Sequence, residues 1–266
     1  MIFETHAHYD DDAFAEDREE LISSLLCGEI GKIINVAASI KSTKTTLKLA
    51  EQYDNLYAAV GVHPSDIADL NEETYVWLRE QTAHPKTVAV GEIGLDYYWD
   101  KELEVQACQR EWFVRQLELA KECRLPVIIH SRDAAEDTMN ILKEAGRWNI
   151  RDNSADEVCG VIHCFSYSPE MAREFVKMGY YIGVGGVVTF KNAKKLKETV
   201  EQIPLERILL ETDCPYMAPE PLRGKRNESS YIPYVIEKIA ELKHVTAEEV
   251  ERVTWDNAMT LFSKIK

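Results

Sequence analysis

A net charge of −15 over 266 residues, with a hydrophobic fraction of 45%, indicates an acidic globular protein with a sizeable core. That charge argues against tight non-specific binding to duplex nucleic acid, which depends on a broad basic surface. No apolar run approaches the roughly 18 residues of a membrane span, and residues 1–30 lack a secretory signal pattern. We therefore expect a cytoplasmic protein without membrane contact or an obligate protein partner.

Short aliphatic and β-branched runs alternate with amphipathic segments along the chain. The runs predict strands at 2–8, 32–37, 56–62, 87–91, 127–130, 160–163, 180–188 and 208–213. Helices are expected at 14–26, 43–53, 72–82, 105–124, 134–145, 170–178, 193–202, 232–242 and 247–262, with a polar stretch at 149–157 and a loop at 214–230. Because the strands lack polar alternation, both faces are expected to be buried, as in a parallel sheet. The pattern predicts one α/β domain over residues 1–266, a TIM (β/α)₈ barrel, with a doubly wound open sheet as the alternative.

Histidines gather at the predicted carboxyl ends of the strands, where the function of such barrels is found. Five of the seven histidines lie there: His6, His8, His63, His130 and His163. Carboxylates at matching positions are Glu92, Glu211 and Asp213. Four histidines and two carboxylates exceed the three protein ligands of a usual catalytic zinc site, so two ions bridged by a carboxylate fit better, and we take Glu92 as the bridge.

The six cysteines show no CxxC spacing and are expected to be reduced, buried thiols. Cys164 and Cys214 each adjoin a candidate ligand. Since successive residues of a strand face opposite sides, both thiols are expected to point away from the site.

Seven motifs extend over the whole length of the chain: Glu4-Thr5-His6-Ala7-His8, Gly61-Val62-His63-Pro64, Gly91-Glu92-Ile93-Gly94-Leu95-Asp96-Tyr97, His130-Ser131-Arg132, His163-Cys164-Phe165-Ser166, Glu211-Thr212-Asp213-Cys214-Pro215-Tyr216 and Arg223-Gly224-Lys225-Arg226-Asn227. Together they resemble the TatD family of metal-dependent hydrolases, a barrel family within the wider amidohydrolase group. The resemblance implies one ion bound by His6, His8, Glu92 and Asp213, and another bound by Glu92, His130 and His163. It also implies cleavage of nucleic acid, described as deoxyribonuclease activity from a 3′ end.

Two positions depart from the family pattern. Ser65 follows His63-Pro64 where the family often has a second histidine, and Tyr167 follows the His163 motif where it often has glycine. Neither is a proposed ligand, but both could alter what the mouth of the site accepts.

Further residues have candidate roles in hydrolysis by a water that two cations activate. Asp213 is the candidate base, and Glu211 either orients the ligands or is a buried hydrogen-bond acceptor. His63 either assists the leaving group or packs at its strand end. Arg223, Lys225 and Arg226 suit phosphate capture or form a solvated loop, and Tyr97, Tyr98 and Trp99 stack bases or pack under their loop.

We therefore predict a divalent-metal-dependent phosphodiester hydrolase, a deoxyribonuclease acting 3′ to 5′ on single-stranded or frayed DNA ends. Zinc, manganese or cobalt suits imidazole-rich ligation, whereas magnesium prefers oxygen ligands. The alternatives are a small-molecule amidohydrolase or esterase, an aminoacyl-tRNA deacylase, and a metal scaffold without catalysis. Amidohydrolases of the first kind often bridge their ions through a modified lysine on strand four, where this chain has Glu92.

Overall fold

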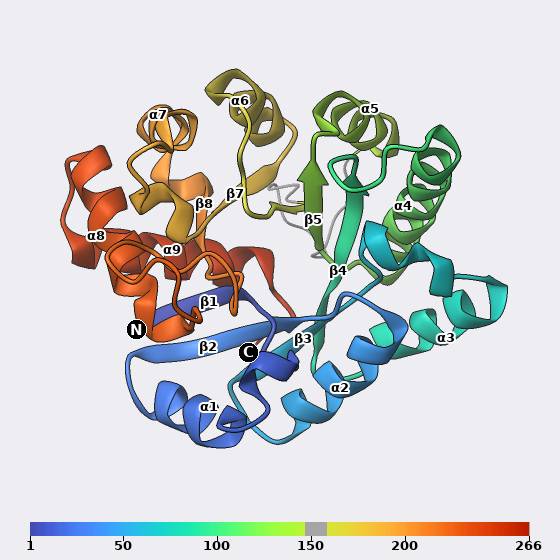
Figure 1. The fold of residues 1–266 in the computed structure, drawn as a ribbon, viewed down its shortest axis with the longest axis horizontal. Helices are drawn as coiled ribbons and strands as arrows, with labels where there is room; N and C mark the ends of the chain where they lie inside the picture. Colours follow the sequence, from blue (N-terminus) through green and yellow to red (C-terminus); the bar gives the residue numbers. More distant parts are fainter. Residues whose placement is uncertain (147–158, 266) are drawn as a thin grey trace.

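The computed structural model describes residues 1–146 and 159–265, so the predicted polar stretch at 149–157 lies outside the described residues. Within the described residues, eight parallel strands form one sheet whose neighbours follow the order of the chain (Figure 1). The strands are β1 (Ile2–Ala7), β2 (Ile30–Val36), β3 (Leu56–Val60), β4 (Thr87–Asp96), β5 (Val127–Arg132), β6 (Gly160–Ile162), β7 (Tyr180–Val184) and β8 (Ile208–Leu210). The predicted strands are thus confirmed as elements, with shifted ends.

Helices surround these strands on the outside (Figure 1). They are α1 (Arg18–Cys27), α2 (Ile40–Glu51), α3 (Glu72–Thr82), α4 (Leu103–Cys123), α5 (Ala135–Ala145), α6 (Pro169–Lys177), α7 (Lys194–Gln202), α8 (Ile232–Lys243) and α9 (Ala247–Leu261). Short 3₁₀ turns are η1 (Asp12–Phe14), η2 (Pro64–Asp69), η3 (Gly186–Thr189), η4 (Leu205–Arg207) and η5 (Ser229–Tyr231). In the part of the chain with described coordinates, no helix has the length and apolarity to cross a membrane.

The barrel closes where its first and last strands meet. Ala7 on β1 forms a parallel bridge with Cys214, which follows β8. The Asp213 amide donates to the His6 carbonyl at 2.9 Å, and the His8 amide donates to the Cys214 carbonyl at 3.0 Å. Because these bonds join the two ends of the sheet, the TIM (β/α)₈ prediction is confirmed and the open doubly wound sheet is wrong.

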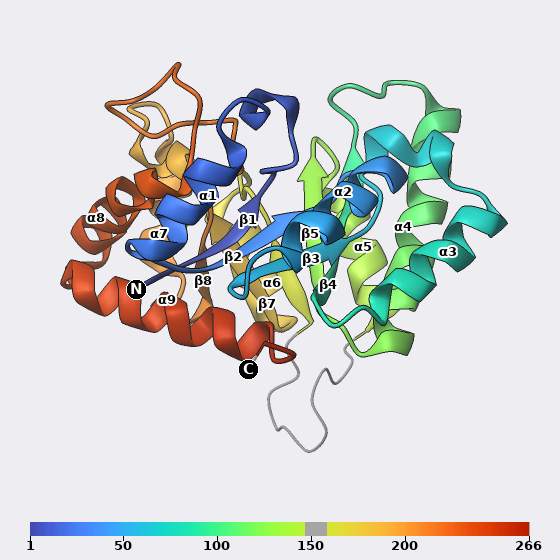
Figure 2. The ribbon, with the colours of Figure 1, turned by 90° about the horizontal axis from the view of Figure 1, so that it is seen from below.

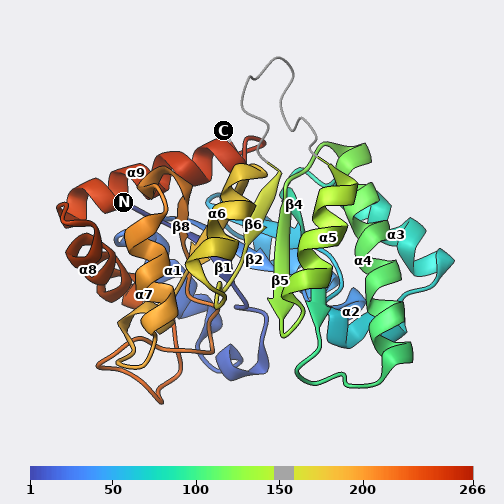
Figure 3. The ribbon, with the colours of Figure 1, turned by 90° about the horizontal axis from the view of Figure 1, so that it is seen from above.

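The interior of the barrel is apolar and is capped at one end by α9. Phe3, Ile34, Ile128 and Leu209 belong to one buried cluster with Leu261 and Phe262 from the end of the chain. Figures 2 and 3 both place α9 at one end of the barrel and the loop 214–230 at the opposite end. The candidate ligands follow the apolar parts of their strands, so they lie at the uncapped end.

Six strands end earlier than their sequence pattern predicts, and β7 and β8 do so by the most residues. The predicted strand 180–188 stops at Val184, and η3 follows it. A Cβ at Gly186 would lie 2.3 Å from the Met217 carbonyl oxygen, so the chain turns here against the loop 214–230. After β6 and β8, Cys164 and Asp213 adopt left-handed backbone conformations with φ of 45° and 57°, which a strand does not contain.

The cysteine prediction is partly wrong. None of the six forms a disulfide in the described structure, but only Cys159 and Cys214 are buried, and Cys27 is exposed. Cys164 lines the cavity at the uncapped end of the barrel. Its left-handed backbone breaks the strand alternation on which the opposite orientation was predicted.

Candidate metal centre

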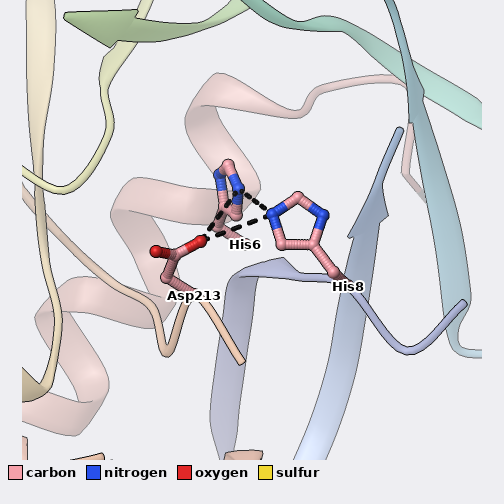
Figure 4. A group of neighbouring side chains, drawn as sticks. All are labelled: His6, His8 and Asp213. Atoms are coloured by element: carbon pink, nitrogen blue, oxygen red, sulfur yellow. Dashed lines mark hydrogen bonds and ion pairs between the residues drawn. The ribbon is translucent and has the colours of Figure 1, made fainter. Parts of the chain in front are cut away.

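His6 and His8 project from the end of β1 toward Asp213, which follows β8 across the closing seam (Figure 4). The Nε2 atoms of the two histidines are 3.1 Å apart. The Asp213 Oδ1 atom lies 3.8 Å from His6 Nε2 and 3.4 Å from His8 Nε2. These three donor atoms therefore surround one small space.

Glu92, on β4, faces two groups of imidazoles with its two carboxylate oxygens. Its Oε2 atom lies 3.5 Å from His6 Nε2 and 3.7 Å from His8 Nε2. Its Oε1 atom lies 2.9 Å from His130 Nδ1 and 3.3 Å from His163 Nε2. The side chain is only 5% exposed, so the carboxylate is enclosed by these nitrogens. It occupies the position expected of a group shared between two neighbouring sites.

The donor spacing around Glu92 Oε2 fits a divalent cation. Four ligands in a tetrahedron around zinc, at zinc–nitrogen distances of about 2.0–2.1 Å, are separated by about 3.4 Å. The five measured separations among His6, His8, Asp213 and this oxygen range from 3.1 to 3.8 Å. The chemistry of the set, two imidazoles and two carboxylates, also suits such an ion.

Three of the histidines are oriented by an oxygen at the ring nitrogen that faces away from Glu92. His8 Nδ1 lies 2.8 Å from the Val36 carbonyl oxygen. His130 Nε2 lies 3.2 Å from Asp96 Oδ2, and His163 Nδ1 lies 3.5 Å from Glu211 Oε2. For His8 and His130, a hydrogen-bond acceptor there keeps the ring proton on the outer nitrogen and the lone pair on the inner one, as in metal-binding histidines, whereas the His163–Glu211 contact is an ion pair.

His63 has the reverse arrangement. Its Nδ1 accepts a hydrogen bond from the Ser65 amide at 3.1 Å, so the neutral ring carries its proton on Nε2. That Nε2 faces Glu92 Oε1 at 3.9 Å. Burial lowers the pKa of His63 to about 4, so the ring is neutral at pH 7. His63 therefore presents an N–H group to the cavity.

Charges within the group strongly perturb one another. Burial alone would raise the pKa of Glu92, but His163 and His63 hold it well below its usual range. Burial opposes a charge on His8 as well, yet the hydrogen bond and charge of Asp213 raise its pKa to about 9. The cluster thus favours anionic carboxylates together with positive charge among the imidazoles. A divalent cation would compete with protons for the same nitrogens.

The structure brings together six predicted ligands and the predicted His63 and Glu211: His6, His8, His63, Glu92, His130, His163, Glu211 and Asp213. Both sequence interpretations of Glu211 describe part of its position. It accepts a hydrogen bond from the Cys164 amide at 2.6 Å, and it faces His163 from the far side. The two residues outside the family pattern also lie here: Ser65 lines the cavity, and the Tyr167 hydroxyl contacts Ser131 Oγ at 2.9 Å.

Sequence reasoning missed two buried carboxylates. Asp96 lies in the motif at residues 91–97, and its contact with His130 follows from the register that pairs the ends of β4 and β5. Glu4 is fully buried two residues before His6, and burial raises its pKa to about 7. It accepts hydrogen bonds from the amides of His6 and Thr212 and from the hydroxyls of Thr212 and Ser229. Its position within a metal-binding motif was the available signal.

The cavity above the donors has a volume of about 1160 Å³. Among the described residues, the basic side chains that line it are Arg18, Lys41 and Arg132, which sequence reasoning also missed. The predicted cluster Arg223, Lys225 and Arg226 is not among the lining residues. Arg226 instead forms a two-pronged pair with Asp17, at 2.7 and 2.6 Å. The Arg223 guanidinium lies 4.4 Å from the Phe190 ring centre.

A parallel barrel with imidazoles and carboxylates gathered at the carboxyl ends of its strands defines a class of metal-dependent hydrolases. A family model described as TatD related DNase matches residues 3–263. YabD of Bacillus subtilis (strain 168), an uncharacterized metal-dependent hydrolase, is 48% identical over 262 residues, covering 98% of this chain and 99% of that protein. YcfH of Escherichia coli (strain K12), another uncharacterized metal-dependent hydrolase, is 34% identical and covers 98% of this chain and 96% of its own.

Among solved structures, YjjV, a TatD homologue from Escherichia coli K12, aligns with a TM-score of 0.89, 34% identity and 98% coverage of both chains. A TatD-family hydrolase from Entamoeba histolytica, at 24% identity and a TM-score of 0.83, shares the fold. The chain therefore belongs to the TatD-related DNase family and is a metal-dependent hydrolase.

Proposed function

We propose that this enzyme holds two divalent cations, zinc, manganese or magnesium, and hydrolyses phosphodiester bonds at the 3′ end of single-stranded or frayed DNA. The observation that carries the proposal is the division of Glu92: one carboxylate oxygen faces His6 and His8, and the other faces His130 and His163. One ion would be held by His6, His8, Glu92 and Asp213, and the other by Glu92, His130 and His163.

Bound cations would supply the positive charge that lowers the pKa of a water molecule and neutralises a phosphodiester. Asp213 faces the same space as His6 and His8, and its pKa is lowered despite its burial because His8 and His163 favour its anion. An anionic carboxylate there can accept the proton of an attacking water. The N–H group of His63 faces Glu92 Oε1, the carboxylate oxygen that is directed away from His6 and His8. It can donate to a phosphate or leaving-group oxygen. Glu211 and Asp96 hold the rings of His163 and His130 in orientation.

The substrate assignment rests on the family description and on the size of the cavity. Its volume of about 1160 Å³ exceeds the roughly 300–1,000 Å³ of sites for small ligands. An acidic protein also gains little from lying along a duplex. A recessed site admits a flexible strand end more readily than a rigid helix. We also propose a cytoplasmic location, which the absence of disulfides in the described structure supports.

The test compares metal-loaded protein on linear single strands, blunt duplexes and closed circular single strands of one composition. We expect release of nucleotides from linear strands, slower action on blunt duplexes, and none on circles. Equal cleavage of circles and linear strands would overturn the end-directed reaction. Charged tRNA and cyclic amides in the same assay test the deacylase and amidohydrolase alternatives, and a chelated sample measures the metal requirement.

A further inference from the structure

Two large aromatic side chains stand exposed on the β4–α4 loop beside the metal centre. Trp99 is 68% exposed and Tyr98 is 44% exposed. Trp99 lines the same cavity as Glu92 and His130, and so does Arg132 at the end of β5. An exposed tryptophan at the rim of a polar cavity costs free energy in water, because its apolar surface stays hydrated. We therefore expect a ligand to cover the exposed ring of Trp99.

The loop that carries these rings is firmly held. Asp96 Oδ1 accepts hydrogen bonds from the amides of Tyr98 and Trp99, at 2.9 and 3.2 Å. Gln109 on α4 accepts from the Asp96 amide at 3.0 Å and donates to Asp100 at 2.6 Å. The other Asp96 oxygen faces His130 Nε2 at 3.2 Å. One carboxylate therefore fixes both the aromatic loop and an imidazole of the metal centre.

Arg132 lies over both rings but closer to Tyr98, and Trp99 remains largely exposed. The guanidinium carbon lies 3.9 Å from the Tyr98 ring centre and 5.6 Å from the Trp99 ring centre. The two aromatic rings meet edge to face, with centres 4.8 Å apart. Arg132 thus supports the pair and brings positive charge to the rim. Aromatic faces next to positive charge are the usual recognition surface for single-stranded nucleic acid, because each nucleotide offers a flat base and a phosphate.

We propose that Trp99 is a stacking subsite for a nucleobase of the strand that enters the cavity, with Tyr98 and Arg132 supporting it and Arg132 attracting the adjacent phosphate. The inference rests on the proposed function and names the feature of the substrate that is bound outside the metal centre. Its chemical requirement is a planar base. A phosphodiester without a base should not use this subsite.

The experiment combines a protein change with a substrate change. Trp99→Ala and the ring-preserving Trp99→Phe are compared with wild type, and Tyr234→Ala on α8, an aromatic residue 37% exposed outside the cavity lining, is the control. Each metal-loaded protein is titrated with a fluorescent phosphorothioate single strand, and with the same strand carrying abasic nucleotides at its 3′ end. Hydrolysis of bis(p-nitrophenyl) phosphate is measured in parallel.

Loss of the ring should weaken binding of the normal strand by roughly 5- to 150-fold, the range of one lost base–aromatic stack. Wild type should lose a similar factor on the abasic strand, and Trp99→Ala should lose nothing further there. The strand affinity of Trp99→Phe should fall between those of wild type and Trp99→Ala. The affinity of Tyr234→Ala should match that of wild type. Equal weakening of Trp99→Ala on both strands, or no preference of wild type for the normal strand, would overturn the subsite.

The proposed function can fail separately. Strand binding that depends on Trp99, without hydrolysis of any phosphodiester, would overturn the nuclease reaction and leave the subsite standing. Cleavage of DNA with equal affinity for normal and abasic strands would leave the reaction and overturn the subsite.

Discussion

Replacing Glu92 by alanine should empty both halves of the metal centre in one step. Each oxygen of this carboxylate serves a different pair of imidazoles, at 3.5 and 3.7 Å on one side and 2.9 and 3.3 Å on the other. Removing a group that only orients a ligand lowers metal affinity by about 10- to 100-fold. Losing the ligand itself should exceed about 100-fold at each site, or about 2.7 kcal/mol. The two ions per chain of the proposed function should fall toward none after dialysis.

Metal content measured by elemental analysis tests this expectation, with far-UV circular dichroism to verify the fold. Glu92 lies within β4, four residues before the strand ends, and belongs to neither buried apolar cluster, so the spectrum should be unchanged. Glu211→Gln is the matched comparison. Glu211 forms its ion pair with His163, so its loss should weaken mainly the ion that His163 would hold. His84→Ala, outside the cluster and paired with Glu51, should change neither.

Retention of both ions by Glu92→Ala would refute the bridging assignment. Loss of a single ion would also refute it, because a carboxylate that serves one site should leave the other intact. A misfolded variant is recognised by its spectrum, and Glu92→Gln, which keeps the volume and one carbonyl oxygen, then replaces it. In that variant we expect weakened binding at both sites, since the amide cannot offer two anionic oxygens.

Substitutions at other positions give further predictions. Asp213→Asn should reduce kcat more than metal content, because the amide still offers an oxygen but cannot accept a proton; recovery of activity with excess ion would make Asp213 only a ligand. Gly94→Ala should lower the free energy of unfolding in urea by more than about 2 kcal/mol, since Gly94 has φ of 143° and its Cβ would lie 1.9 Å from the His130 carbonyl oxygen. Arg226→Ala should change the urea unfolding midpoint little, as expected for its partly exposed pair with Asp17, and should leave the salt dependence of strand binding unchanged. Removing Arg223 and Lys225 together should flatten that salt dependence.

The positions of the metal-binding candidates could be predicted because parallel strands impose a common direction. In a barrel of such strands, all carboxyl ends lie on one rim, so residues as distant as His6, Glu92 and His163 meet there without any knowledge of side-chain packing. Glu211 was expected at the same rim; it follows the end of β8 and lies 3.5 Å from His163 there.

Side-chain partners that depend on loops could not be predicted in this way. Arg226 was expected at the phosphates, but the folding of its loop brings it to Asp17, 209 residues earlier in the chain. Cys164 was expected to face away, and a single left-handed residue directs it into the cavity. Alternation holds only within a strand, and pairing across loops depends on backbone angles that composition does not determine.

The closing seam of the barrel is also the place where half of the candidate metal centre is assembled. His6 and His8 come from β1 and Asp213 follows β8, the first and last strands of the sheet. Glu4 joins the two sides, since it accepts hydrogen bonds from the amides of His6 and Thr212, both at 3.0 Å. Pairing β1 with the segment after β8 brings together two distant parts of the chain, which has a loop-closure cost in entropy. Any cation that binds these three ligands together stabilises the closed barrel by its binding free energy, because an open seam cannot offer all three.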